Sequence, residues 1–215
     1  QYFAAVTGVD EQFGRLLEFL KENGMEEDTI VVLSADHGEM LGSHGHMGKN
    51  VWYEESIHIP LYIRQKGRLV PVKYKELVAS PDHMPTILGL LNIPVPDTCQ
   101  GFNHAPGILG QENDAPQDAF LCSYPGMPEM VAAFEKQGLN SKCYGWRGLR
   151  THTYTFVINN GYEPGEKQVK MLYNNEEDPY QQNPIMITEL NEELAADYEK
   201  RLREYLDMQQ DPFLM

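Results

Sequence analysis

Residues 35–49, ADHGEMLGSHGHMGK, contain the side chains of this sequence that are best suited to chemistry. Asp36 and His37 are adjacent, and a carboxylate oxygen with an imidazole nitrogen suits a divalent cation. Adjacent side chains on a strand point apart, so both reach one ion only where the backbone turns, and Gly38 permits that turn. Calcium prefers more carboxylates than this loop offers, so the loop alone predicts half of a metal site.

Lys49 follows a glycine-rich turn and is a mobile point charge suited to a tetrahedral anion. A cation and a lysine that face one cavity would polarise a phosphate or sulfate ester. His44 and His46 could donate a proton to a leaving group or contact the anion. Each of these side chains alone is more often solvated or hydrogen-bonded, and an Asp-His-Gly turn often only caps a helix. Their combination after one apolar run favours a site.

The segments on either side must position this loop. Residues 29–34, TIVVLS, form an apolar run without alternation, which is typical of a strand buried in a parallel sheet. The loop would then lie at the carboxyl end of a strand, where open α/β sheets bind ligands. Residues 1–24 predict a preceding helix, whose buried face would carry Val6, Val9, Phe13, Leu16, Leu17 and Leu20.

The remaining pattern divides into two parts. Residues 58–63 predict a second strand, residues 80–96 a helix that ends at Pro94, and residues 96–118 a connecting loop. Beyond it, strands at 119–124, 150–159 and 167–174 precede a helix with an apolar side, which is typical of a small antiparallel α+β unit. That side would contain Ile187, Leu190, Leu194, Tyr198 and Leu202. We therefore predict an α/β fold with domains at 1–118 and 119–215.

The composition of the chain argues against some classes of function. The net charge is −15, from 17 basic and 32 acidic residues, and no basic run exists, which argues against a nucleic-acid binder. No apolar stretch approaches membrane-spanning length. Cys99, Cys122 and Cys143 show neither metal-ligand spacing nor a disulfide framework. The cysteines therefore do not indicate in which cellular compartment the protein works. Because Gln1 opens a helix pattern and no signal peptide precedes it, we expect a chain that begins inside a larger protein.

The stretch TIVVLSADHGEMLGSHGHMGKNVWYEESIHIPLYIR resembles the sulfatase family of the alkaline-phosphatase-like superfamily. The flanking residues 2–32 and 83–96 are similar to the helices around this strand in the family, and residues 147–159 and 171–185 to its C-terminal subdomain. The resemblance therefore covers nearly the whole chain. Its motifs are Asp36-His37-Gly38, Leu41-Gly42, His44-Gly45, Gly48-Lys49, Tyr53-Glu54-Glu55-Ser56 and Pro60-Leu61.

The resemblance implies roles for individual residues. Asp36 and His37 match two ligands of a divalent metal, usually calcium, and Lys49 matches the lysine that contacts the sulfate group. His44 matches a recurrent His-Gly position and is included with Lys49 as a candidate catalytic residue. The family also requires a formylglycine nucleophile, made from a Cys or Ser in a Cys/Ser-x-Pro/Ala-x-Arg motif, and two further acidic ligands. We expect both in an N-terminal half that this sequence lacks.

One cysteine and one arginine have the same spacing as in the nucleophile motif. Cys143 and Arg147 have its spacing, but Gly145 occupies the position of Pro or Ala, and the segment lies in the predicted C-terminal unit. We therefore interpret Cys143 as a buried or loop cysteine.

The expected protein is a sulfatase acting on an aryl sulfate or a sulfated sugar, of which this chain is an inactive C-terminal portion. One alternative is a phosphodiesterase or phosphonate monoester hydrolase of the same superfamily, which shares the metal loop. Another is a non-catalytic module that binds metal or a sulfated glycan. A periplasmic or secreted full-length protein is compatible with the resemblance. Because a divided sheet leaves apolar faces uncovered, we also expect the chain to self-associate.

Overall fold

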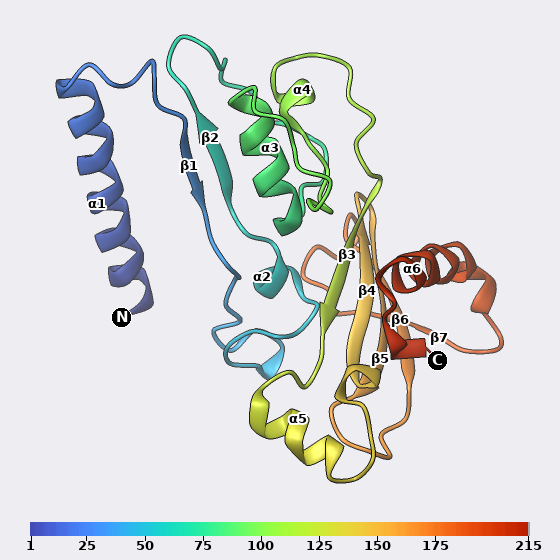
Figure 1. The fold of residues 1–215 in the computed structure, drawn as a ribbon. Coiled ribbons are helices and arrows are strands. Elements are labelled where there is room, and N and C mark those ends of the chain that lie inside the picture. Colours follow the sequence, from blue (N-terminus) through green and yellow to red (C-terminus); the bar gives the residue numbers. More distant parts are fainter. Residues whose placement is uncertain (215) are drawn as a thin grey trace. The chain divides into compact units, whose positions relative to one another are not determined.

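The computed structural model describes residues 1–214 of the chain (Figure 1). Two compact units form, one from Gln1–Asp36 with Ile59–Tyr74, the other from His37–His58 with the residues from Lys75 onward. None of the helices in the described part is long and apolar enough to cross a membrane. In chain order the elements are α1 (Tyr2–Glu22), β1 (Val31–Ser34), α2 (Glu54–Ile57), β2 (Leu61–Arg64), α3 (His83–Leu90), α4 (Ala105–Ile108), β3 (Asp118–Ser123), α5 (Pro128–Glu135), β4 (Gly145–Thr151), β5 (Tyr154–Gly161), β6 (Val169–Asn174), β7 (Ile185–Ile187) and α6 (Ala196–Gln209).

The first unit contains α1, β1 and β2. The predicted helix is confirmed, but within the described residues none of its side chains is buried, and Val9 and Leu16 are 63% and 61% exposed. Strands β1 and β2 pair antiparallel, with Val31 opposite Arg64 and Ser34 opposite Leu61. The parallel pairing expected from the apolar run is therefore wrong for this pair. Continuous apolar runs are common in parallel sheets, but such a run does not fix the direction of any one neighbouring strand.

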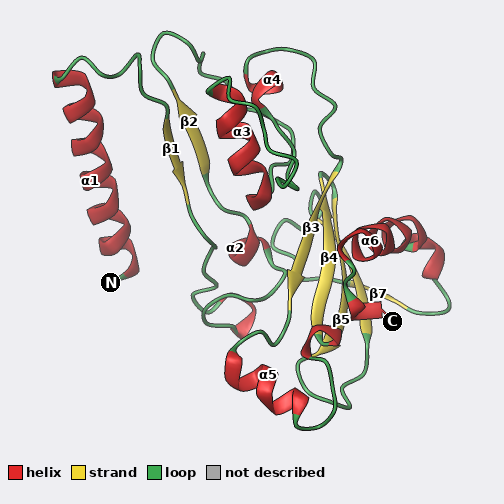
Figure 2. Cartoon of the chain, in the orientation of Figure 1, coloured by secondary structure: helices red, strands yellow, loops and turns green. Residues whose placement is uncertain are grey.

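The second unit is built on a five-stranded antiparallel sheet in the order β3-β4-β5-β6-β7. Figure 2 shows these strands side by side, with α6 against them. One face of the sheet packs on α6 and the segment after it, and the other face packs on Trp52, Tyr53 and Ile57. The first face contributes Leu149, Phe156, Ile158 and Leu172, and the second Trp146, Val157, Met171 and Tyr173.

This sheet confirms the predicted antiparallel α+β unit, with differences in its limits. The predicted strand 150–159 is the end of β4, a turn at His152 and Thr153, and β5. The final helix begins only at Ala196, because Ile187 belongs to β7 and Leu190 is 92% exposed. The proposed boundary between residues 118 and 119 concerns the domains of an intact protein and stays a prediction.

Candidate active site

The loop after β1 begins with a close backbone approach. The Gly38 amide donates to the Ser56 carbonyl at 2.9 Å. A Cβ atom on Gly38 would lie 1.9 Å from the Glu55 carbonyl oxygen, so the position accepts only glycine. Gly38 thereby brings the start of the loop against α2.

Backbone hydrogen bonds close the loop on itself. The Met40 amide donates to the Gly48 carbonyl at 2.8 Å, and the Gly42 amide to the His46 carbonyl at 2.9 Å. The Met40 side chain is 1% exposed and anchors this closure in the core. Residues 40 and 48 therefore lie side by side, and the part of the loop between them projects as a compact turn. Left-handed backbone conformations at Leu41, Gly42, His44, Gly45, Gly48 and Asn50 produce the turn.

The predicted site residues fall on both units. Asp36, which is exposed, ends the first segment of one unit, while His37, His44 and Lys49 belong to the loop of the other. The Nδ1 atom of His37 lies 2.7 Å from the Gly38 carbonyl oxygen and must donate to it. In the neutral ring, Nε2 then carries the lone pair that a metal requires.

An aromatic contact fixes His44. Its ring is stacked on that of Tyr53, with centroids 3.7 Å apart and an interplanar angle of 8°. Tyr53 in turn meets Tyr173 of β6 edge-on, with centroids 6.1 Å apart. The His44 side chain is therefore oriented through Tyr53 by the sheet.

Polar side chains of the sheet hold the start of α2. Arg150 Nε donates to Glu54 Oε1 at 2.6 Å, and the Glu54 amide donates to Gln181 Oε1 at 2.8 Å. Burial opposes ionisation of Glu54, but hydrogen bonds from His58 and Arg150 outweigh it and lower the pKa of Glu54 to about 2. Glu54 is therefore an anion at neutral pH and forms an ion pair with Arg150.

Sequence reasoning missed the residues that support the loop, namely Trp146, Arg150, Tyr162 and Gln181. Trp146 Nε1 donates to the Asn50 carbonyl at 2.9 Å, and Trp52 Nε1 donates to the Tyr173 hydroxyl at 3.1 Å. These partners lie about a hundred residues apart in sequence, and no local pattern predicts such pairs.

The donor set for a metal is partial. Among residues 1–214, no group of three or more His, Cys, Asp or Glu side chains is arranged to hold a metal ion. Asp36 and His37 offer one oxygen and one nitrogen donor, which fits two positions in the coordination of a divalent cation.

Cys143 has the surroundings of a structural thiol. Its Sγ donates to the Pro212 carbonyl at 3.5 Å, and burial raises its pKa. A thiol that keeps its proton is a poor nucleophile. These contacts support the interpretation of Cys143 as a structural residue.

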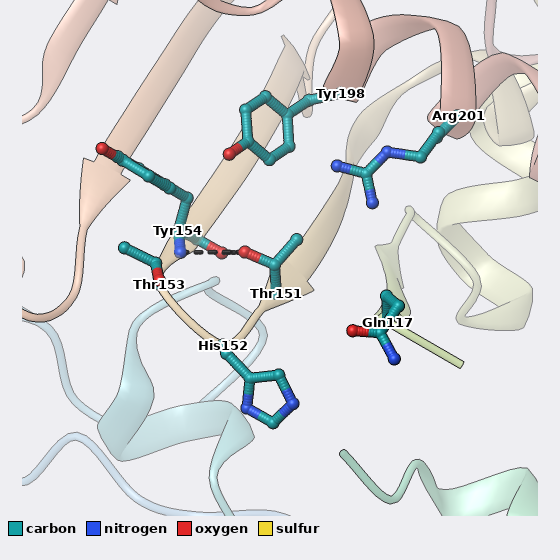
Figure 3. A pocket seen from close by; sticks show the side chains of 7 residues that line it. All are labelled: Gln117, Thr151, His152, Thr153, Tyr154, Tyr198 and Arg201. Carbon is teal, nitrogen blue, oxygen red and sulfur yellow. Dashed lines mark hydrogen bonds between the residues drawn. The ribbon is translucent and has the colours of Figure 1, made fainter. Parts of the chain in front are cut away.

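A cavity of about 310 Å³ lies elsewhere in the second unit (Figure 3). Arg201 supplies its cationic group, and this guanidinium is already paired with Asp118 and Asp197. Among the residues that line the cavity, the Tyr154 amide donates to Thr151 Oγ1 at 2.9 Å. The cavity contains none of the predicted site residues; its lining is Gln117, Thr151, His152, Thr153, Tyr154, Tyr198 and Arg201.

Known proteins resemble this chain along almost its whole length. A family model described as Sulfatase matches residues 1–93. An endo-4-O-sulfatase of Bacteroides thetaiotaomicron is 32% identical over 216 residues, which are 99% of this chain and 42% of that protein. A solved structure from the same species, described in connection with glycosaminoglycan metabolism, has a TM-score of 0.84 at 32% identity, and the match covers 99% of this chain and 44% of that one.

A phosphonate monoester hydrolase is also similar in structure. The enzyme of Agrobacterium radiobacter has a TM-score of 0.76 at 25% identity, and the match covers 95% of this chain and 40% of that one. The chain thus spans less than half the length of each of these relatives.

Proposed function

The chain belongs to the sulfatase family, and on that premise we propose that the protein containing it is a sulfuric ester hydrolase. The observation that carries the proposal is the loop with Lys49, which is closed by backbone bonds and lies within the stretch that the family model matches. A fixed loop backbone restricts where the Lys49 ammonium can lie before substrate arrives, and preorganised charge is usually the largest contribution to electrostatic catalysis.

In this proposal Lys49 contacts the sulfuryl oxygens of the ester. Its ammonium stabilises the charge on the sulfuryl oxygens while the bond to the leaving oxygen breaks. His44, oriented by Tyr53, lies on the same loop and is proposed to donate a proton to the leaving oxygen or to contact the anion.

Asp36 and His37 are proposed as two ligands of a divalent cation, with calcium as the expected ion. The cation would neutralise charge on the sulfuryl oxygens when bound. The remaining ligands and the formylglycine nucleophile are proposed to come from parts of the protein outside this chain. With two donors only, the chain alone should bind calcium weakly, which calorimetry of the chain with calcium would test. Tight binding that survives Asp36→Ala would place the metal elsewhere.

The proposed substrate is a sulfated sugar. The support is that relatives spanning this whole chain are named for a 4-O-sulfatase activity or described in connection with glycosaminoglycans. An aryl sulfate is the simpler probe of the same bond cleavage and serves as the reference substrate.

The experiment compares Lys49→Ala with wild type in the full-length protein. We expect kcat/KM on sulfate esters to fall about a hundredfold, the usual effect of removing one preorganised charge contact. Lys200→Ala is the matched control, because Lys200 is an exposed lysine that makes a 4.0 Å pair with Glu204 at the surface. Wild-type kcat/KM in Lys49→Ala would overturn the site assignment.

A second candidate is phosphonate monoester hydrolysis, favoured by the structural similarity to the Agrobacterium radiobacter enzyme. Side-by-side kcat/KM values for an aryl sulfate and an aryl phosphonate separate the two reactions. A preference for the phosphonate would replace the proposal, and binding of sulfated sugar without hydrolysis of either ester would favour a non-catalytic module.

A further inference from the structure

Lys49 lies between two carbonyl groups that are fixed by other parts of the chain. On one side, the Gly48 carbonyl accepts the Met40 amide at 2.8 Å. On the other side, the Asn50 carbonyl accepts two donors, Trp146 Nε1 at 2.9 Å and the Tyr162 hydroxyl at 3.2 Å. The backbone that carries the Lys49 side chain is therefore held from both directions.

The conformation of Asn50 requires such support. Its φ is +78°, in the left-handed region that side chains with a Cβ rarely adopt, although asparagine tolerates it better than most. A conformation of this kind persists where surrounding contacts over-determine it, and such positions cluster at functional sites. Here two side-chain donors contact the Asn50 carbonyl and restrain the peptide group next to this conformation.

Both donors are themselves held by the sheet. Trp146 of β4 is 3% exposed and meets Trp52 edge-on, with ring centroids 5.7 Å apart. Tyr162, directly after β5, has its hydroxyl 2.8 Å from Ser123 Oγ of β3. Burial raises the pKa of Tyr162, so the hydroxyl keeps its proton at neutral pH and can donate.

We propose that Tyr162 and Trp146 are positioning residues for Lys49, which set the place of its ammonium by fixing the Asn50 carbonyl. The inference rests on the proposed function, in which the Lys49 ammonium contacts the sulfate group. It adds that side chains of the sheet orient this ammonium. Neither side chain needs to touch substrate. A displacement of about 1 Å in a reacting group can cost a hundredfold in rate, so small shifts of this carbonyl should be measurable in turnover.

The test uses Tyr162→Phe in the full-length protein, since this variant removes one donor and keeps the ring. We expect kcat on a sulfate ester to fall by about fivefold, the size of one lost hydrogen bond. In a Lys49→Ala background the same substitution should have no further effect, because its action passes through Lys49. Tyr205→Phe is the matched control: the Tyr205 hydroxyl donates to Asp118 Oδ1 at 2.8 Å on the face of the sheet that packs on α6, and kcat should not change.

Hydrogen exchange gives a readout that does not depend on activity. Peptides covering residues 41–51 should exchange about tenfold faster in Tyr162→Phe than in wild type or Tyr205→Phe. Equal losses of kcat in the wild-type and Lys49→Ala backgrounds would overturn the positioning role, as would unchanged exchange in the loop. If the wild-type protein hydrolyses no sulfate ester, the proposed function fails, while faster exchange would still support the fixing of the loop by Tyr162.

Discussion

The imidazole of His44 lies flat against the ring of Tyr53, with centroids 3.7 Å apart. Tyr53 also contacts Tyr173 of β6. The two tyrosine rings therefore connect the His44 ring to the sheet and orient it. The position of the His44 ring therefore depends on a residue nine positions later and on another in a distant strand.

Removing the stack should reduce turnover. In the full-length protein, Tyr53→Leu should lower kcat/KM on a sulfate ester about three- to tenfold, since an aromatic pair contributes roughly 0.5–1.5 kcal/mol. Tyr53→Phe keeps the stack and should retain near-wild-type kcat/KM. Equal losses in both variants would show that the hydroxyl, and not the ring contact, matters.

The ion pair between Glu54 and Arg150 should make stability depend on pH in acid. The pKa of Glu54 in the folded protein, about 2, lies below its ordinary value of 4.5. The stabilisation is therefore complete above about pH 5 and is lost as pH falls toward 2. Glu54→Gln should lower the free energy of unfolding by about 1–2 kcal/mol at pH 7, and the difference from wild type should shrink at pH 3.

Urea unfolding of wild type and Glu54→Gln at the two pH values measures this effect. Arg203→Met is the control, because Arg203 pairs with Glu199 at the surface and its loss should change stability by less than about 1 kcal/mol. A difference that stays constant from pH 7 to pH 3 would contradict the ion-pair explanation.

Gly38→Ala should disrupt the start of the loop. The added Cβ would lie 1.9 Å from the Glu55 carbonyl oxygen, and backbone must move to relieve the contact. We expect a loss of about 3 kcal/mol in unfolding free energy, measured by denaturant titration. Gly14→Ala in α1 is the matched control: nothing lies within 4 Å of the methyl group that alanine would add there, and the change should stabilise by up to about 1 kcal/mol. A fully stable Gly38→Ala protein would disprove the close approach.

The 215-residue chain by itself should self-associate. Apolar side chains of α1, including Phe3, Val9 and Leu16, are 61–80% exposed, and such surface favours association. Light scattering should detect oligomers that diminish when Val9 and Leu16 are both changed to Glu. Gln12→Glu adds charge without removing apolar area and should have less effect. A monomer at high concentration would refute the expectation.

The sequence predicted the elements whose own side chains alternate or repeat. The predicted alternation through Tyr154, Phe156 and Ile158 places Phe156 and Ile158 on one face of β5, where both are fully buried, while Val157 between them is buried on the opposite face. The final helix was predicted too long because Ile187 and Leu190 happen to fall at helical spacing. Asn191 instead ends that pattern: its side-chain oxygen accepts the Thr188 amide at 2.7 Å, which forms a local turn before α6.

The candidate site could be proposed from the sequence only where its residues are close together in the chain. Asp36, His37, His44 and Lys49 come from one stretch, and their types indicate chemistry. Trp146, Arg150 and Gln181 are ordinary strand and loop residues in sequence, and only folding brings them to the loop. The antiparallel direction of β2 relative to β1 could not be predicted either, because it depends on both strands together and not on the apolar residues of one strand.

The long separation between the loop and its supports has a consequence for biosynthesis. Gln181 lies 127 positions after Glu54, and Trp146 lies 96 positions after Asn50. Contacts between such distant positions form late, because the intervening chain must first be closed into a loop at an entropic cost. The segment with Lys49 therefore leaves the ribosome long before its supports exist, and its final shape is acquired only once β4 to β6 have been translated. A messenger truncated before β4 would encode every residue of the loop 35–49 and neither Trp146 nor Gln181, the side chains that hold Asn50 and Glu54.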